Sequence, residues 1–345
     1  MKIKLSTQNF NDALNNLQKE YKVYAPVSVP FKGTYSDTDL VRYNTIKSIE
    51  EVEFNKKANF SPKEIVLPIT QTLFYFTEDA YIEPSIDDKK ILIFLRSCDI
   101  HGLKRVDEIY LNNGQDPDYY YKRLRDKVKY VLIGCEESFR NCFCVSMGSN
   151  KTEEYSMGLK LENNEVYLDI KDEDLSQYFS GENTEFEVDY VKENNMTVNV
   201  PENLDPLVIS QATELWEEYN SRCIACGRCN FSCPTCTCFT MQDIFYKDNE
   251  NNGERRRVWA SCQVDGYTDM AGGHSFRKNK GDRMRFKTLH KVYDFNKKFG
   301  YHMCVGCGRC DDACPQYISF STCINKVYDF VNKEADKNEE SVPAT

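Results

Sequence analysis

Hydrophobic and polar positions at the start of the chain follow a helical period. Four apolar residues recur there at intervals of three and four, namely Phe10, Leu14, Leu17 and Tyr21. This spacing places them on one face and predicts a helix over residues 1–21. Two apolar segments follow, residues 23–29 and 65–76, and we expect each to form a strand.

A strand–helix–strand pattern comes next. The runs at residues 90–96 and 127–133 are short and apolar, as in strands that are buried on both faces. Between them, apolar residues at helical spacing predict a helix over residues 99–111. This alternation favours a small α/β domain with some parallel strand pairing.

An acidic and polar stretch, residues 150–205, completes this first domain. Within it, alternating apolar residues at 158–161 and 166–170 flank the sequence Glu-Asn-Asn-Glu, which predicts a hairpin. We therefore expect an α/β domain with an inserted hairpin over residues 1–205.

The chain changes character after residue 205. Apolar residues return to helical spacing and lead into a dense group of cysteines; they are Val208, Ala212, Leu215 and Tyr219. Residues 285–299 also have a helical pattern. We expect a second, mostly α-helical domain over residues 206–330. Because residues 331–345 are polar and charged, we expect them to form a disordered tail.

Composition and charge exclude several classes of function. The net charge is −10 and the pI is about 5.2, whereas proteins that bind nucleic acid or anionic membrane surfaces need a basic face. No apolar run approaches the roughly 18 residues of a membrane span. The N-terminus also lacks the apolar core and cleavage site of a signal peptide. We therefore expect a cytoplasmic protein that binds neither nucleic acid nor membrane.

The cysteine content is unusually high, with sixteen residues. Disulfide-rich scaffolds are usually shorter than about 100 residues, so we expect reduced thiols, most of which bind metal. Two blocks share the spacing C-x2-C-x2-C-x3-C-P, which is the run that binds [4Fe–4S] clusters in bacterial ferredoxins. The first block is Cys223, Cys226, Cys229 and Cys233; the second is Cys304, Cys307, Cys310 and Cys314.

The fourth cysteine of each block is expected to cross to the other cluster. Three thiolates at this spacing can bind three corners of one cubane, whereas the fourth, which precedes a proline, reaches the other cluster in two-cluster ferredoxins. We therefore expect cluster I to be held by Cys223, Cys226, Cys229 and Cys314, and cluster II by Cys304, Cys307, Cys310 and Cys233. Zinc is the alternative, but its sites use two pairs of ligands. The two complete runs favour a dicluster ferredoxin-like domain.

The N-terminal domain contains a further candidate site. Cys98 and Cys135 each follow a predicted strand, and the carboxyl ends of strands form the ligand crevice of an open α/β sheet. With Cys142 and Cys144 on the next loop, four thiolates could converge on a third [4Fe–4S] cluster. The alternative is that all four are ordinary buried thiols, and the sequence leaves both open.

Four cysteines remain after these assignments, and their scatter favours packing around the clusters; they are Cys236, Cys238, Cys262 and Cys323. No catalytic motif accompanies the cysteine blocks. The sequence has no G-x-G-x-x-G after a strand, no phosphate-binding loop and no H-E-x-x-H. We therefore expect a chain that moves electrons and has no catalytic site of its own. A redox sensor would need a DNA-binding or signalling module, and none is visible in the sequence.

Six motifs occur in the order found in one known family; they are FLRSCDIHGLKRVD (94–107), CFCVSMG (142–148), CPTCTC (233–238), RRRVWASC (255–262), AGGHSFRKNK (271–280) and CVGCGRC (304–310). Together they resemble an iron–sulfur protein that two systems share. It is the iron–sulfur subunit of the three-component anaerobic sulfite reductase and the beta subunit of cytosolic sulfhydrogenase-type NiFe hydrogenases. The resemblance covers roughly residues 65–325.

The resemblance implies an electron relay. In the sulfite reductase, this iron–sulfur subunit connects a flavin-containing, NADH-oxidising subunit with a sirohaem subunit that reduces sulfite to sulfide. The overall length and the undecorated N-terminus favour the sulfite reductase. The alternative is the electron-transfer beta subunit of a cytosolic NiFe hydrogenase.

Overall fold

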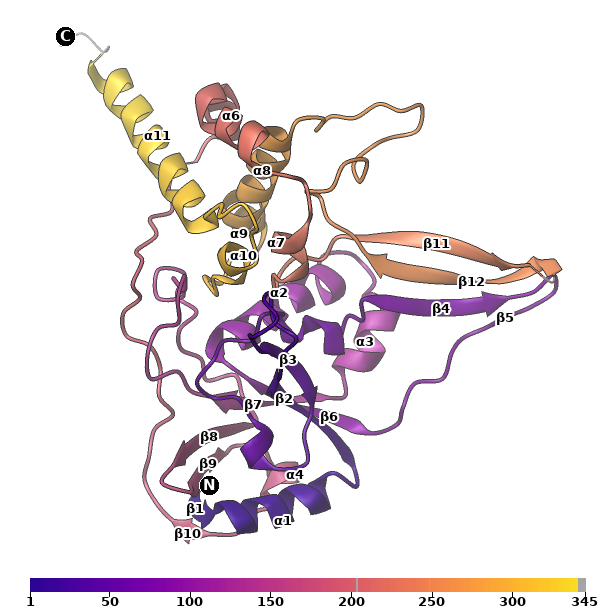
Figure 1. Cartoon of the computed structure of the whole chain (residues 1–345), viewed down its shortest axis with the longest axis vertical. Coiled ribbons are helices and arrows are strands. Elements are labelled where there is room, and N and C mark those ends of the chain that lie inside the picture. Colours follow the sequence, from indigo (N-terminus) through magenta and orange to yellow (C-terminus); the bar gives the residue numbers. More distant parts are fainter. Residues whose placement is uncertain (203, 248, 341–345) are drawn as a thin grey trace.

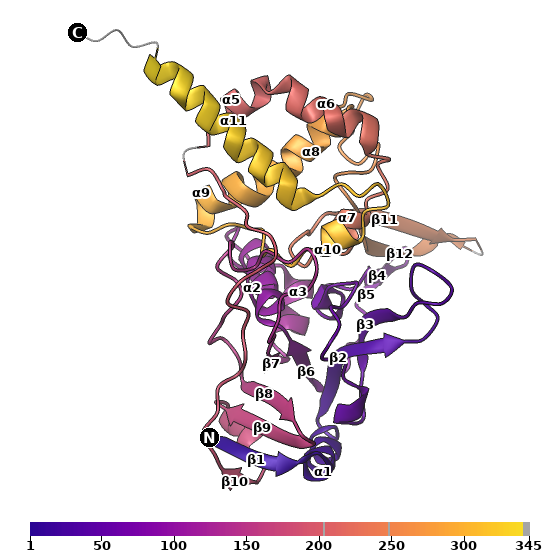
Figure 2. The same cartoon turned by 60° about the vertical axis from the view of Figure 1, so that its left-hand side comes forward.

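The computed structural model describes residues 1–202, 204–247 and 249–340. A body built on an eight-stranded sheet carries a head of helices, and a four-stranded arm projects sideways where the two meet (Figure 1). The N-terminus lies in the body, whereas the last helix, α11 (Phe320–Glu340), lies in the head (Figure 2).

Eight strands form the body sheet: β1 (Lys2–Ser6), β2 (Tyr21–Val29), β3 (Leu40–Thr45), β6 (Lys90–Leu95), β7 (Val128–Ile133), β8 (Met157–Glu162), β9 (Glu165–Ile170) and β10 (Glu182–Asn183). Their spatial order is β10-β1-β9-β8-β7-β6-β2-β3. The central strands β2, β6, β7 and β8 pair in parallel, and the flanking pairs are antiparallel. The N-terminal region is therefore built on a mixed sheet with parallel pairing at its centre.

The central strand β6 shows why both faces of this sheet are covered. Leu92 and Phe94 belong to the core under helix α1 (Thr7–Leu17), and the alternate residues of the strand belong to the core under helix α2 (Ser97–Leu111). Because successive side chains of a strand point to opposite faces, a strand covered on both sides is apolar throughout. The other helical segments of the body are α3 (Tyr119–Arg125), α4 (Glu173–Ser176) and the 3-10 turns η1 (Ile49–Glu51) and η2 (Pro62–Ile65).

Most elements predicted for this region are confirmed. The expected strands at 23–29, 90–96 and 127–133 appear as β2, β6 and β7, and the expected helix at 99–111 appears as α2. The predicted hairpin is the antiparallel pair β8 and β9. Each of these segments carries its own apolar pattern, which is continuous or alternating in the strands and helically spaced in α2.

Two predictions near the N-terminus are wrong in extent. The expected helix over residues 1–21 begins only at Thr7, because residues 2–6 form β1, where Ile3 and Leu5 alternate into the core. The Ser6 hydroxyl accepts a hydrogen bond from the backbone N–H of Asn9 and so caps the helix. The expected strand at 65–76 is restricted to β4 (Thr70–Phe76).

The head contains the helices that surround the cysteine blocks: α5 (Pro206–Gln211), α6 (Thr213–Arg222), α7 (Arg228–Phe231), α8 (Lys280–Leu289), α9 (Phe295–Phe299), α10 (Arg309–Asp312) and α11. A π-helical turn, η3 (His290–Asp294), joins α8 to α9. Helix α11 continues to Glu340, so residues 331–340 of the expected disordered tail are helical here. Residues 341–345 lie outside the described residues.

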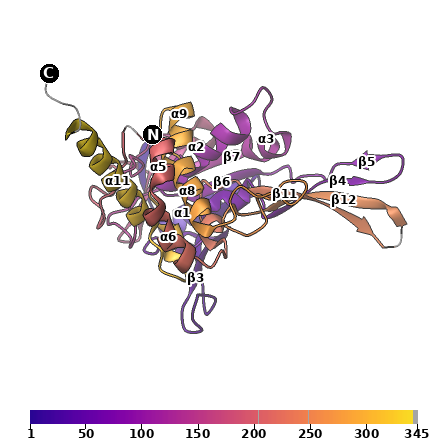
Figure 3. The same ribbon diagram turned by 90° about the horizontal axis from the view of Figure 1, so that it is seen from above.

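The C-terminal region is not mostly helical, because the segment between the two cysteine blocks forms the arm. Strands β11 (Phe239–Tyr246) and β12 (Asn249–Trp259) make an antiparallel hairpin. Strand β12 also pairs with β4, which pairs with β5 (Tyr81–Ile82). Figure 3 shows the arm extending away from the rest of the molecule. Sequence reasoning missed this hairpin because β11 is exposed along almost its whole length, so no buried face marks it as a strand.

Candidate iron–sulfur centres

A first cavity in the head is lined by four cysteines of the ferredoxin-type blocks: Cys223, Cys226, Cys229 and Cys314. Cys223 and Cys226 come from the segment that joins α6 to α7, Cys229 lies in α7, and Cys314 comes from the turn after α10. Cys310 also reaches the wall of this cavity, which Met284 and Phe320 help to close. Three cysteines of the first block and the last cysteine of the second block therefore face one space.

A second cavity is lined by the complementary set: Cys304, Cys307, Cys310 and Cys233. Phe143, from the body, closes part of this cavity. The last cysteine of each block thus lines the cavity of the other block. This is the arrangement that crossed ligation requires.

The two blocks repeat the same backbone turns. Ala225 and Gly306 occupy equivalent positions with φ of 58° and 63°, and Gly227 and Gly308 do so with φ of 75° and 69°. Left-handed residues between ordinary ones gather backbone N–H groups into a concave surface that favours anions. The N–H of Ala225 donates to the Cys223 sulfur at 3.4 Å. The backbone N–H groups of these turns can therefore donate hydrogen bonds to negatively charged sulfur.

Close contact with the body explains the glycines of the second block. A Cβ atom at Gly306 would lie 2.5 Å from the backbone carbonyl of Phe143, and one at Gly308 would lie 2.2 Å from the carbonyl oxygen of Asn141. In the first block, the position equivalent to Gly306 is occupied by Ala225, which has a Cβ atom. The second block is therefore packed directly against the loop that carries the N-terminal cysteines.

Two buried lysines lie beside these cavities. Lys287 of α8 lines both cavities and is 4% exposed; Lys291 of η3 lines the second and is 2% exposed. Burial alone lowers the pKa of Lys287, but neighbouring thiolates, Cys229 first, raise it well above its usual value. Within the described ranges neither lysine forms an ion pair with a carboxylate; Lys291 donates to the Thr235 hydroxyl at 2.6 Å.

Buried ammonium groups are costly unless an anion lies nearby. An iron–sulfur core bound by thiolates is negatively charged and would be such an anion at this position. Thiolate donors, inward backbone N–H groups and buried cations without a carboxylate partner together fit [4Fe–4S] clusters. The side chains present in both cavities are therefore compatible with the expected cofactor.

The structure brings the four N-terminal cysteines into one region. Cys98 lies in the first turn of α2, directly after β6, and Cys135 follows β7. Cys142 and Cys144 come from the next loop. Cys144 is close enough to interact electrostatically with Cys135 and Cys142, and Cys98 interacts with Cys144. The region lies at the carboxyl ends of two neighbouring parallel strands.

Nitrogen donors surround three of these sulfurs: Arg96 donates to Cys135 at 3.1 Å, Lys57 to Cys142 at 3.7 Å and Asn194 to Cys144 at 3.6 Å. Two of the three donors are cationic. Burial raises the pKa of Cys144 to about 11, although the Asn194 amide opposes this shift. A metal would have to displace the thiol proton here, and the positive surroundings favour the resulting thiolate.

This region adjoins the second cavity. The Cys142 thiol donates to the carbonyl oxygen of Cys307 at 3.4 Å, and the Phe143 N–H donates to the carbonyl oxygen of Gly306 at 2.7 Å. Cys98 and Cys307 are also close enough to interact electrostatically. The N-terminal cysteines and the second block are therefore direct neighbours.

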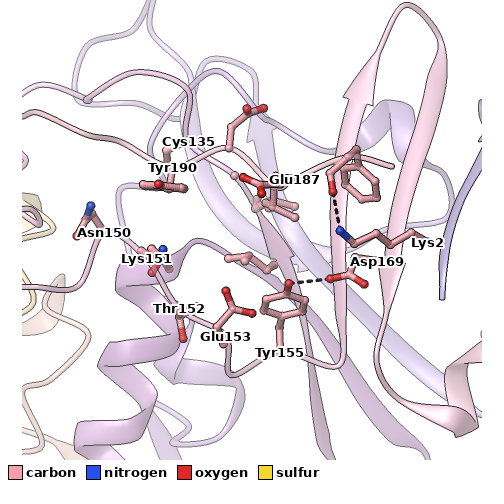
Figure 4. Close-up of a pocket in the computed structure, with 17 residues that line it drawn as sticks. Lys2, Cys135, Asn150, Lys151, Thr152, Glu153, Tyr155, Asp169, Glu187 and Tyr190 are labelled. Carbon is pink, nitrogen blue, oxygen red and sulfur yellow. Dashed lines mark hydrogen bonds between the residues drawn. The ribbon is translucent and has the colours of Figure 1, made fainter. Parts of the chain in front are cut away.

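An open cavity of about 230 Å³ lies on the body side of Cys135 (Figure 4). Its lining is polar and includes Lys151, Glu153, Tyr155 and Glu187. Cys135 is the one cysteine among its lining residues, so the cavity adjoins the cysteine group only at this residue.

The cysteines interpreted as scattered packing residues divide into two groups. Cys236, Cys238 and Cys262 line a third cavity, with Lys287 and Lys291 in its wall. Cys323 lies apart, fully buried on α11, with its sulfur 3.5 Å from the Thr288 hydroxyl. Three of the four therefore share the wall of one cavity, whereas Cys323 does not. One sequence signal could have grouped them. Cys236 and Cys238 form a C-x-C directly before β11, and Cys262 follows β12, which returns beside β11.

Two features are absent from the part of the chain that the structure describes. No group of three or more His, Cys, Asp or Glu side chains in those ranges is arranged to hold a single metal ion. None of the helices described is both long enough and apolar enough to cross a membrane.

Comparison with known proteins identifies the family. Residues 222–318 match the 4Fe-4S dicluster domain family. The chain is 30% identical over 350 residues to "Sulfhydrogenase 2 subunit beta" of Pyrococcus furiosus, a match that covers 94% of this chain and 98% of the relative. No solved structure matches. The chain therefore belongs to the family of the sulfhydrogenase 2 beta subunit, as an iron–sulfur electron-transfer subunit with a 4Fe-4S dicluster domain.

Proposed function

We propose that the chain relays electrons between two other subunits of an oxidoreductase complex and has no catalytic site of its own. The observation that carries this proposal is the pair of cavities lined by ferredoxin-type cysteines, with Lys287 in the wall of both. Bound [4Fe–4S] clusters supply one-electron transfer. The chain contributes the thiolates, excludes water from them and offsets their charge with buried lysines.

Each cluster is assigned four cysteines. Cluster I is held by Cys223, Cys226, Cys229 and Cys314, and cluster II by Cys304, Cys307, Cys310 and Cys233. The lining of the two cavities supports this crossed set. Crossing ties the two halves of the dicluster domain together, because each cluster needs sulfur from both blocks.

A third [4Fe–4S] cluster is assigned to Cys98, Cys135, Cys142 and Cys144. Their mutual proximity and the nitrogen donors on three of the sulfurs support this site. Contact between Cys142 and the backbone of Cys307 supports its position next to the second cavity. The body would then extend the relay of the head rather than serve only as its scaffold.

The complex is proposed to be a cytoplasmic anaerobic sulfite reductase. The partners would be a flavin subunit that oxidises NADH and a sirohaem subunit that reduces sulfite to sulfide. The sequence motifs from residue 94 to residue 310 support this assignment by their resemblance to the iron–sulfur subunit of that enzyme. Sulfite itself would bind to the sirohaem subunit.

A NiFe hydrogenase is the second candidate, and one observation favours it. The relative with near full-length similarity is named as a sulfhydrogenase subunit. In that case the chain would serve a nickel-containing catalytic subunit with the same set of cysteines.

Anaerobic purification of the native complex tests both the relay and its partner. In the chain separated from its partners, iron and acid-labile sulfide at about eight atoms each would support the two ferredoxin-type clusters, and each further cluster would add about four. Sirohaem absorption in the complex would support the sulfite reductase, whereas nickel would select the hydrogenase. A chain without iron would overturn the relay altogether.

A further inference from the structure

The third cavity has the size and lining of a further cluster site. Its cavity volume is about 160 Å³, against about 30 and 20 Å³ for the first and second cavities. Three cysteines line it, Cys236, Cys238 and Cys262, and none of them belongs to the ferredoxin-type runs. A space that is larger than either of the other two can accommodate a core of the same kind.

The arm brings these cysteines together. Cys238 immediately precedes β11, and Cys262 follows the end of β12 by three residues. The Ala260 N–H donates to the carbonyl oxygen of Cys238 at 2.9 Å, which closes the base of the hairpin. Cys238 and Cys262 line the same cavity. Strand pairing therefore holds two thiols side by side at the point where the arm joins the head.

Buried amides point at one of these sulfurs. The side-chain NH₂ of Asn230 donates to the Cys262 sulfur at 3.1 Å, and that of Gln263 is 3.7 Å from it. Asn230 and Gln263 are each only 1% exposed. Buried donors gathered on a sulfur stabilise its thiolate form, which is the form that binds metal.

Three buried lysines add positive charge around the cavity. Lys287 and Lys291 line it, and Lys63, which is 2% exposed, donates to the carbonyl oxygen of Cys236 at 2.7 Å. None of these three lysines forms an ion pair with a carboxylate in the part of the chain that the structure describes. Lys287 and Lys291 also line the ferredoxin-type cavities, so their charge is shared among the three sites, and Lys63 adds to it. Buried cations are costly unless an anion lies nearby.

We propose that Cys236, Cys238 and Cys262 hold a further [4Fe–4S] cluster, with His290 as the fourth ligand. This inference rests on the proposed function, because it adds a centre to the same relay. His290 lines the cavity at the start of the π-helical turn η3, and such turns are frequent at functional sites. Its Nδ1 lies 3.8 Å from a carboxylate oxygen of Asp294, which is too far for a hydrogen bond. As iron binds, each thiol releases its proton to solvent.

The test compares single variants of the full-length chain prepared without oxygen. Cys262→Ser and Cys238→Ser should each lower iron and acid-labile sulfide by about four atoms per chain relative to the wild type. One EPR signal of the reduced protein should disappear while the others persist. Cys236 is a less suitable target, because it neighbours Cys233 of the second cavity.

Cys323→Ser is the matched control, because Cys323 is buried in the same region and lines none of the three cavities. It should retain the iron of the wild type. His290→Ala is a second probe for the case in which the cysteine variants do not fold, since the side chain is 39% exposed. It should change the EPR signal of one cluster and leave the others unchanged.

Wild-type iron in both cysteine variants, or an unchanged EPR spectrum in His290→Ala, would overturn the proposal. Loss of one zinc ion instead of four iron atoms would overturn it too. In these cases the relay itself stands as long as the wild type contains iron. A wild-type chain with no iron would overturn the proposed function and this inference together.

Discussion

Asp99 and Arg309 form a fully buried ion pair with two hydrogen bonds, at 2.5 and 2.8 Å. Asp99 follows Cys98 in the chain, and Arg309 precedes Cys310. The Tyr43 hydroxyl donates to the same carboxylate at 3.1 Å, and Arg309 donates to the carbonyl oxygen of Ala58 at 2.8 Å. One salt bridge therefore joins the N-terminal cysteine group to the second ferredoxin-type block.

Asp99→Asn should destabilise the chain strongly, because it leaves the Arg309 guanidinium buried without a counter-charge. Breaking such a pair from one side costs about 3–5 kcal/mol. Denaturant unfolding under anaerobic conditions measures the change in the free energy of unfolding. Lys104 lies on the same helix as Asp99 and forms an exposed ion pair with Glu154, so Lys104→Ala should cost at most about 1 kcal/mol. Equal costs for the two variants would contradict a structural role of the buried pair.

Crossed ligation predicts which variants share a phenotype. Cys226→Ser and Cys314→Ser should remove the same EPR signal, although they belong to different blocks. Cys233→Ser should instead remove the signal that Cys307→Ser removes. Each should lower iron by about four atoms per chain. If Cys233→Ser and Cys226→Ser were to affect the same cluster, the crossed assignment would be wrong.

Cys135→Ser should remove the third cluster from the body. Iron and acid-labile sulfide should fall by about four atoms each, because one of four thiolates is lost from a site that Arg96 and Lys57 surround with positive charge. Both ferredoxin-type signals should remain. Iron content equal to that of the wild type would mean that the four N-terminal cysteines are ordinary buried thiols.

Gly306→Ala should destabilise the chain more than Gly300→Ala does. Both glycines have positive φ, at 63° and 81°, so each substitution carries a backbone cost of about 1–2 kcal/mol. Only at Gly306 would the new methyl group also collide with the backbone of Phe143; nothing lies within 4 Å at Gly300. Thermal unfolding of the two variants separates the collision from the backbone cost. Equal shifts in Tm would show that the loop moves aside freely.

Lys287→Met should make the reduction potentials of the neighbouring clusters more negative, because a buried positive charge that favours the added electron is removed. Unit charges about 8 Å apart interact by about 2 kcal/mol at an effective dielectric constant of about 20. Since about 1.4 kcal/mol corresponds to about 59 mV for one electron, the shift should be on the order of 50–100 mV.

A redox titration followed by EPR measures these potentials. Lys326→Met is the control, since Lys326 is 41% exposed and pairs with Glu218 at the surface. Its potentials should equal those of the wild type. Potentials that stay unchanged in Lys287→Met would show that Lys287 is neutral or screened in the loaded protein.

The sequence predicted those elements whose own residues show a hydrophobic pattern. The run of β6 is apolar from Ile91 to Leu95, so its burial on both faces follows from composition alone. Strand β1 was missed because only Ile3 and Leu5 mark it, and its partner β9 begins at Glu165. Short strands depend on pairing with distant segments, which a single sequence does not display.

The candidate sites divide in the same way. The ferredoxin-type cysteines were identifiable because their spacing reflects the shape of the cofactor. Cys238 and Cys262 have no such spacing, and only the pairing of Phe239 with Trp259 brings them together. Lys287 was not singled out at all, since a lysine in a helical segment normally faces solvent. Its role depends on burial, which the helix pattern of α8 does not reveal.

The contact between the arm and the body limits how the molecule can be divided. Strand β12 lies between β11 and β4, and β4 comes from residues before the first cysteine block. A fragment that begins at residue 206 would leave one edge of β12 unpaired and Arg309 without Asp99. Exposed strand edges are prone to aggregation. Expression of the cysteine-rich half alone should therefore yield an insoluble product, and biochemical work on its clusters needs the entire polypeptide.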